Sequence, residues 1–147
     1  MSLFGAIDIS GSGLAAERLR MDVTAENLAN AQSTQGADGQ PYRRKEVVLR
    51  QAAGGFENEL STAMGAQGGS PARGVEVVAI AEDTAPNRMV YDPGHPDANA
   101  EGYVSMPNVD PVTEMVDLIA ASRAYEANVT AMQTAKSMFT KTLDLLR

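Results

Sequence analysis

The chain has 147 residues, no cysteine and a net charge of −7, which excludes disulfides, thiol catalysis and cysteine-ligated zinc. An acidic surface repels a phosphate backbone, so no nucleic-acid partner is expected. Hydrophobic residues make up 44% of the sequence, which is enough for a folded core. The apolar runs are all shorter than about 18 residues, so no direct membrane span is expected.

Residues 1–31 carry an apolar stripe at helical spacing. Its members lie seven residues apart and therefore share one side of a helix: Ile7, Leu14, Met21 and Leu28. Gly11 and Gly13 interrupt the segment, and each costs about 1 kcal/mol in a helix interior. The sequence predicts a firm helix from about residue 14 to residue 31, preceded by a looser segment.

Two asparagines near the end of this helix allow two interpretations. Asn27 and Asn30 are three positions apart, so they lie on one side of the helix. In a helix packed among others, both would be buried and would bond a neighbour's backbone or polar side chain, which fixes the register. Alternatively, Asn30 caps the helix end and Asn27 faces solvent.

Residues 32–108 predict a β-rich domain. Turn-forming residues occupy 32–41. Four runs rich in β-branched or aromatic residues follow, at 42–50, 75–81, 88–91 and 103–106, and turn residues separate them. The segment around 51–74 contains two Gly-Gly pairs and predicts a flexible loop. A small, mainly antiparallel sheet is the simplest arrangement.

The motif DPGHPDA begins at residue 92, and its two prolines restrict the backbone conformation. Its two prolines fix their own φ angles and restrict the residues before them. We predict a rigid contact loop between the sheet and the following helix, in which Asp92 or Asp97 accepts backbone hydrogen bonds; an ordinary surface turn is the alternative. The loop consists of Asp92, Pro93, Gly94, His95, Pro96 and Asp97.

The same loop offers the best case for an enzyme. Asp92, His95 and Asp97 include metal-ligand and acid–base residue types, and His95 is the one histidine of the chain. Three ligands within six residues, two of them beside prolines, would make a cramped site without visible supporting residues. We therefore expect no catalytic residue, no metal and no cofactor, and keep a metal-dependent enzyme as a remote alternative.

Residues 109–147 predict a long helix. Asp110 and Pro111 are suited to the N-cap and the first helical position. Apolar residues recur at alternate steps of three and four, interrupted by Ser122 and Lys136. The members of this seam are Met115, Leu118, Tyr125, Val129, Met132, Phe139, Leu143 and Leu146. A second stripe, Val112, Val116 and Ile119, predicts burial on a wider arc near the helix start.

The two predicted helices differ in length, at roughly 55 Å and 27 Å by the rise of an α-helix. About half of the C-terminal seam would then face water in a monomer, which favours association; the alternative is that the β-rich domain covers it. The expected subunit-packing residues are Leu14, Met21, Asn27, Leu28, Asn30, Met115, Leu118, Tyr125, Asn128, Val129, Met132, Phe139, Leu143 and Leu146.

Three stretches resemble the flagellar axial proteins, and among them the subunits of the proximal rod. The first is SGLAAERLRMDVTAENLANAQST, residues 12–34, although Glu26 stands where many axial proteins have a first asparagine. PYRRKEVVL, residues 41–49, is similar to the first strand of those proteins. The third is YDPGHPDANAEGYVSMPNVDPVTEMVDLIAASRAYEANVTAM, residues 91–132. The resemblance covers about residues 10–50 and 75–147.

The resemblance implies an α+β fold, in which long N- and C-terminal helices (1–31 and 109–147) pack together and a small β domain (32–108) is inserted between them. It implies a structural subunit of the flagellar basal body whose helices pack with adjacent subunits, transmit torque and surround the export channel. Implied partners are other rod proteins, the hook–basal body junction protein, the MS ring and export gate, and further copies of the chain.

The resemblance also implies a periplasmic location reached through the flagellar type III export apparatus without a cleaved signal. The first ten residues agree, because they lack a positive n-region and carry Asp8 within their apolar stretch. We expect folding to be coupled to assembly: the isolated chain keeps the β domain and leaves both ends mobile. A homo-oligomeric coiled-coil adaptor is the alternative that also explains the heptads.

Overall fold

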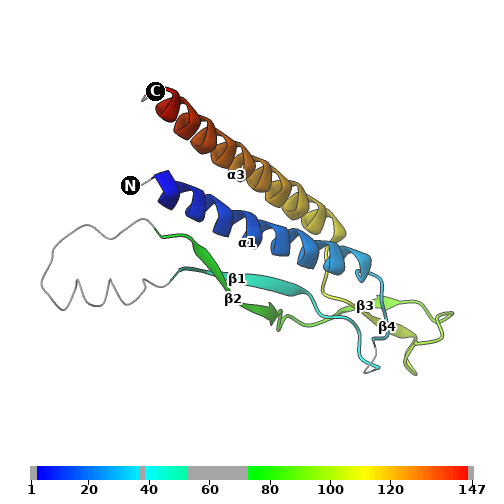
Figure 1. The fold of residues 1–147 in the computed structure, drawn as a ribbon. Coiled ribbons are helices and arrows are strands. Elements are labelled where there is room, and N and C mark those ends of the chain that lie inside the picture. The colour runs from blue at the N-terminus through cyan, green and yellow to red at the C-terminus, as the bar shows by residue number, and fades with distance from the viewer. Residues whose placement is uncertain (1–2, 37–38, 53–72, 146–147) are drawn as a thin grey trace, which may run out of the picture.

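The computed structural model describes residues 3–36, 39–52 and 73–145 and has the predicted α+β architecture (Figure 1). In sequence, one helix precedes the four short strands and another helix follows them. In chain order the elements are α1 (Leu3–Ala29), β1 (Lys45–Gln51), β2 (Val75–Glu82), β3 (Arg88–Tyr91), β4 (Tyr103–Met106) and α3 (Pro111–Leu145).

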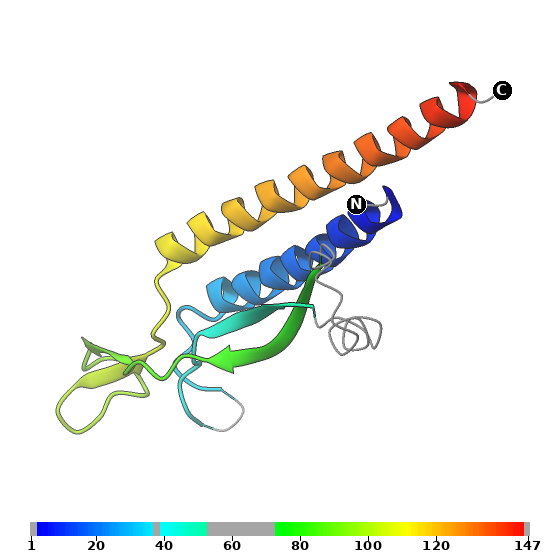
Figure 2. The same cartoon turned by 90° about the vertical axis from the view of Figure 1, so that its left-hand side faces the viewer.

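Helix α1 is the central layer of the molecule. It lies between α3 on one side and the β1–β2 pair on the other (Figures 1 and 2). The two helices are antiparallel, so both chain termini lie at one end of the helical pair. The β3–β4 pair lies at the opposite end, close to the start of α3. Contacts of α1 therefore hold the whole arrangement together.

The prediction of a loose segment before residue 14 is wrong, because α1 is helical from Leu3 onward. The glycines lie where neighbours approach closely. A methyl group on Gly13 would lie 2.9 Å from the amide nitrogen of Asn128 in α3. Between the glycines, the Ser12 hydroxyl accepts a hydrogen bond from the Val75 backbone N–H at 3.0 Å. Close packing on both sides of the helix offsets the cost of glycine in it.

The length mismatch between the helices is smaller than predicted. Because α1 extends back to Leu3, its 27 residues span about 40 Å against about 52 Å for the 35 residues of α3. Gly11 faces Met132 and Gly13 faces Asn128, so the start of α1 falls opposite the region of Phe139. Only the last turns of α3 extend past its partner.

The inward face of α3 is offset by about one residue from the predicted seam. Its buried residues are Glu114, Ala121 and Ala135; small alanines thus occupy the interface, where they permit a close approach of the two helices. The chain itself does not bury the second stripe: Val112, Val116 and Ile119 are 64%, 60% and 55% exposed. A helix with one partner buries one stripe, and that stripe is the one with small residues.

Four strands form as predicted, but in two separate two-stranded antiparallel sheets, β1–β2 and β3–β4. The first strand begins at Lys45, three residues later than predicted, and in the preceding segment the side chains of Tyr42 and Arg44 contact the helices. Val48 pairs with Ala79 and Leu49 with Val77, which inserts an extra residue into β2 as a β-bulge. Most of the predicted 51–74 loop lies outside the described residues.

Two glycine substitutions test the close packing of the helices. Gly11→Ala adds a methyl group 3.8 Å from Met132, an ordinary contact, so replacing glycine in the helix interior should stabilise the fold by about 1 kcal/mol. Gly13→Leu places bulk against Asn128 and should lower the melting temperature in circular dichroism. Equal effects at the two positions would contradict this packing.

Candidate functional site

Asn27 lies at the meeting point of α1, β1 and α3 and is 1% exposed. Its amide nitrogen donates to the Lys45 carbonyl oxygen at 2.8 Å and to Glu114 Oε2 at 3.1 Å. Its oxygen accepts from the Tyr42 hydroxyl and from the Lys45 backbone N–H, both at 2.9 Å. The amide therefore fills all four of its hydrogen-bonding positions, and every partner belongs to the same chain.

Glu114 carries a negative charge into this buried position and is 1% exposed. Its Oε1 accepts a hydrogen bond from Arg44 Nε at 2.6 Å, and this bond raises the pKa of the guanidinium above its usual value. The Arg44 backbone N–H donates to Asn108 Oδ1 at 2.9 Å. A buried carboxylate is stable only when its oxygens are paired in this way, so Glu114 requires both Asn27 and Arg44.

Tyr42 and Lys45 complete the cluster from the chain segment that enters β1. Burial raises the pKa of the Tyr42 hydroxyl to about 12, and the nearby carboxylates of Glu26 and Glu114 add to the effect. The Lys45 ammonium lies 2.6 Å from Glu26 Oε1 and over the Tyr42 ring, 5.5 Å from its centre. We call Asn27, Tyr42, Arg44, Lys45 and Glu114 the polar junction.

The structure separates the two asparagine interpretations. Asn30 lies just after the end of α1; its side chain donates to the Glu26 carbonyl oxygen at 2.9 Å and accepts from the Ser33 hydroxyl at 3.2 Å. Its capping role is confirmed. Asn27 does not face solvent, as that interpretation required; it is buried and bonds neighbouring elements of its own chain. All four of its hydrogen bonds are thus made within the chain.

The 92–97 loop lies between β3 and β4, so its predicted place between the sheet and α3 is wrong. Asp92 Oδ1 accepts a backbone hydrogen bond from Gly94 at 3.1 Å, as predicted for one of the two aspartates. Asp97 instead accepts from the side chains of Thr34, at 2.7 Å, and Gln35. The loop is thus fastened to the segment that follows α1.

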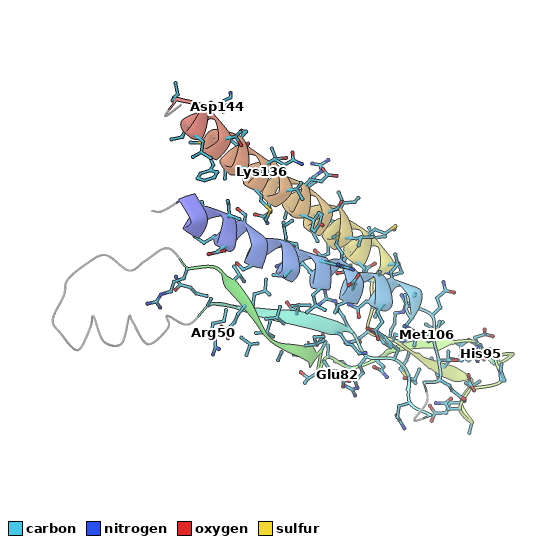
Figure 3. The ribbon with its side chains drawn as sticks, viewed as in Figure 1. Arg50, Glu82, His95, Met106, Lys136 and Asp144 are labelled. Atoms are coloured by element: carbon cyan, nitrogen blue, oxygen red, sulfur yellow. The ribbon has the colours of Figure 1, made fainter. Side chains whose placement is uncertain are left out.

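The three residues of the metal-dependent enzyme alternative, Asp92, His95 and Asp97, do not form a metal site. Among residues 3–36, 39–52 and 73–145, no three Asp, Glu or His side chains are placed to hold one metal ion. Nδ1 of His95 accepts a hydrogen bond from the Asp97 backbone N–H at 3.1 Å, and the Asp97 carboxylate is occupied by Thr34 and Gln35. Figure 3 places His95 at the far end of the β3–β4 hairpin.

The other predicted packing residues divide into two groups. The half-buried ones are Leu14, Met21, Leu28, Leu118, Tyr125, Asn128, Val129 and Met132, and of these Asn128 and Met132 face the glycines of α1. The exposed ones are Met115, Phe139 and Leu143; Leu146 lies outside the described residues. Neither helix of the described part is long and apolar enough to cross a membrane.

An exposed apolar patch covers the start of α3 on the side turned away from α1. It consists of Val112, Met115, Val116 and Ile119, at spacings that place all four on one side of a helix; we call it the base patch. The helix begins as predicted: Asp110 Oδ1 accepts from the Val112 N–H at 3.0 Å, the expected N-cap geometry. Four large apolar side chains in two turns favour contact with another protein.

Sequence analysis missed Tyr42, Arg44, Lys45 and Glu114. One signal was available for Glu114. It lies four residues before Leu118 and seven before Ala121, so it is a charged residue on the same side of the helix as these two apolar residues. Such a position requires a buried partner. Nothing in the sequence alone identifies Arg44 as that partner among the twelve cations of the chain.

Removing the buried carboxylate tests the polar junction. Glu114→Ala removes the buried carboxylate that pairs with Arg44 and Asn27, while Arg44 keeps its contact with Asp117 at 3.5 Å. The free energy of unfolding should fall by about 2 kcal/mol, less than for a fully buried pair because Arg44 reaches solvent. Glu46→Ala is the matched control, since Glu46 contacts the same arginine at 3.9 Å from an exposed position. Urea unfolding measures both, and equal losses would contradict the assignment.

Two family models match the two ends of the chain. Residues 7–37 match the family model "Flagella basal body rod protein", and residues 100–145 match "Flagellar basal body rod FlgEFG protein C-terminal". The first match covers most of α1, and the second covers β4 and α3. Both matched segments contribute residues to the polar junction.

Relatives from distant bacteria match over nearly their whole length, and each is named flagellar basal-body rod protein FlgC. The protein of Yersinia enterocolitica is 49% identical and that of Bacillus subtilis 47% identical, with 99% of this chain and at least 98% of each relative covered. The protein of Borreliella burgdorferi is 39% identical over the whole of this chain and 99% of its own. The chain belongs to the FlgC family of flagellar basal-body rod proteins.

Proposed function

We propose that this structural rod subunit joins its neighbours through the surface of α3 that α1 leaves uncovered. The observation that carries the proposal is the base patch, whose members Val112 and Val116 are more than half exposed. Burying one such side chain contributes on the order of 1.5–3 kcal/mol. A subunit that buries this patch against its neighbours therefore gains stability that the isolated chain lacks.

The internal packing suits a part that transmits torque. Small residues, among them Gly13 and Ala121, let the helices approach closely, and dense packing resists deformation. The polar junction joins this helical pair to β1 through Asn27 and Arg44. A twist applied to the helices is then passed to the β region, and a ring of such subunits would surround an export channel.

The partners, the location and the export route extend this proposal. Family membership supports interaction with other basal-body components; the specific neighbours proposed are other rod proteins, the hook–basal body junction protein, the MS ring and export gate, and further copies of the chain. The proposed location is the periplasmic part of the basal body, reached through the flagellar type III apparatus. The proposed role is structural and not enzymatic, and membership of the rod-protein family supports it.

Folding coupled to assembly remains part of the proposal, but for a smaller region than both helices. The polar junction anchors the end of α1 to the start of α3, so these parts of the helices are held in the isolated chain. We propose that loss of order in the isolated chain is confined to the opposite end of the pair. There Met138, Leu143 and Leu145 are 57%, 50% and 88% exposed, and few contacts oppose fraying.

Two charge substitutions test assembly through exposed surface. Val116→Asp and Leu143→Asp replace exposed side chains, so each should change the stability of the isolated chain by less than about 0.5 kcal/mol. Both should abolish rod assembly, because a carboxylate would be buried at the subunit contact without a partner. Swimming in soft agar measures this in cells that lack the native protein.

The matched control is Thr84→Asp, at an exposed turn between β2 and β3. It introduces the same charge at a distance from α3 and should leave swimming intact. Normal swimming with both α3 variants would contradict the proposed surface. Sedimentation of the isolated chain separates the alternative: a closed small oligomer would favour a coiled-coil adaptor, whereas a monomer favours a subunit that joins a larger assembly.

A further inference from the structure

A polar crevice opens beside the polar junction, where α1, β1 and α3 come together. Its volume is about 220 Å³, which is room for several waters or for one small organic cation. The side chains of Glu46 and Asp117 are 71% and 46% exposed, so the crevice is open to a ligand from outside. We call this space the junction crevice; the lining residues that matter below are Thr24, Arg44, Glu46, Glu114 and Asp117.

Three carboxylates line the junction crevice, and Arg44 contacts all of them. Its contact with Glu114 is close, at 2.6 Å, but Asp117 lies 3.5 Å and Glu46 3.9 Å from the guanidinium. A charge-assisted hydrogen bond between a nitrogen cation and a carboxylate is about 2.7–2.9 Å long. Arg44 therefore satisfies one carboxylate well and leaves acceptor capacity on the other two.

The other cations that line the crevice are paired with acids outside it. Arg20 lies 3.6 Å from Glu17, and the Lys45 ammonium lies 2.6 Å from Glu26; neither of these two glutamates belongs to the lining. Each of these pairs is neutral. Inside the crevice one guanidinium thus stands against three carboxylates, and this excess of negative charge favours a second cation.

Thr24 gives an independent indication that the crevice takes a ligand. It is 5% exposed and lines the crevice. Helix threonines such as Thr130 and Thr134 donate to the carbonyl oxygen four residues earlier, at 2.9 Å. Within the part of the chain that the structure describes, the Thr24 hydroxyl has neither that bond nor another partner. A buried hydroxyl without a partner is costly, so it requires a ligand or water.

We infer that the junction crevice binds a guanidinium group, in the form of an arginine side chain that another protein inserts. A guanidinium is planar, has five N–H donors and is more weakly hydrated than an ammonium. It can donate to Glu46 and Asp117 at the opening and to the Thr24 hydroxyl oxygen below them. Two guanidinium groups against three carboxylates leave a net charge of −1, so repulsion between the two cations is offset.

This site goes beyond the proposed function, which assigns only apolar contacts to the exposed side of α3. The site is charged, and three elements of the fold build it. Its occupant would be held by ion pairs, which are directional and add specificity to a contact. Because the polar junction forms one wall, the occupant would also bridge α3 and β1 and reinforce the junction.

Nuclear magnetic resonance on the isolated full-length chain tests the site with guanidinium chloride as the probe, at millimolar concentrations far below those that unfold proteins. Urea has nearly the same shape without the charge and is the matched control ligand. Sodium chloride at equal concentration corrects for ionic strength. The expected result is a saturable shift of the backbone amide signals of Thr24, Val47 and Asp117, with guanidinium alone.

Two substitutions locate the binding. Asp117→Asn removes one carboxylate without changing its shape and should weaken guanidinium binding about threefold, the effect of one partly exposed ion pair. Thr24→Val removes the hydroxyl and should weaken it as well. The matched control is Glu101→Gln, an exposed position between β3 and β4, which removes the same charge and should leave binding unchanged. Thermal melts verify that each variant is folded.

Swimming in soft agar tests whether an arginine of a neighbour occupies the crevice in the rod. Asp117→Lys places a cation of this chain in the crevice and should impair swimming by repelling the inserted one. Glu101→Lys makes the same charge reversal away from the crevice and should swim normally. Asp117→Asn should impair swimming less, and it keeps the test valid if the lysine variant is less stable.

Two results would overturn the inference. No saturable shift with guanidinium, or equal shifts with urea, would show that the crevice holds only water. Normal swimming of both Asp117 variants would show that no cation of a neighbour enters it. The proposed function is tested separately by Val116→Asp. If that variant fails to swim while guanidinium does not bind, the rod function stands and only this site is rejected.

Discussion

The buried hydrogen bonds of Asn27 are the interaction on which the rest of the structure depends. One amide contacts β1 through both backbone groups of Lys45 and contacts α3 through Glu114. A buried amide or carboxylate that loses its partner is costly, so the three elements must meet in one register. That register places α1 between the sheet and α3, and it decides which side of α3 remains exposed.

The division of residues around α3 follows from this register. Alanines face α1, where Ala121 is fully buried, and glycine at position 13 faces Asn128. Large apolar residues such as Val116 and Ile119 are left outside. A stable monomer would favour the opposite choice, since burying large side chains contributes more to stability than burying small ones. The distribution is the one expected for a subunit whose larger contacts are made with its neighbours.

The fold class, the two terminal helices and the four strands could be predicted because hydrophobic period and turn residues are local signals. The start of α1 could not, since Gly11 and Gly13 weaken a helix locally but lie where Met132 and Asn128 of α3 approach closely. The buried side of α3 lies one residue away from the predicted seam, at Glu114, Ala121 and Ala135. Periodicity alone does not show whether small or large residues face the partner helix. Arg44 and Tyr42 were missed because their pairing with Glu114 and Asn27 joins segments distant in sequence.

Amide hydrogen exchange on the isolated full-length chain and on assembled basal bodies tests the central claim most directly. The account predicts slow exchange in the isolated chain around residues 23–29 and 111–121, where the polar junction anchors both helices, and fast exchange from about residue 130 to the end of α3. In the assembled rod, that second region should become protected. Uniformly slow exchange along α3 in the isolated chain, unchanged by assembly, would contradict the account.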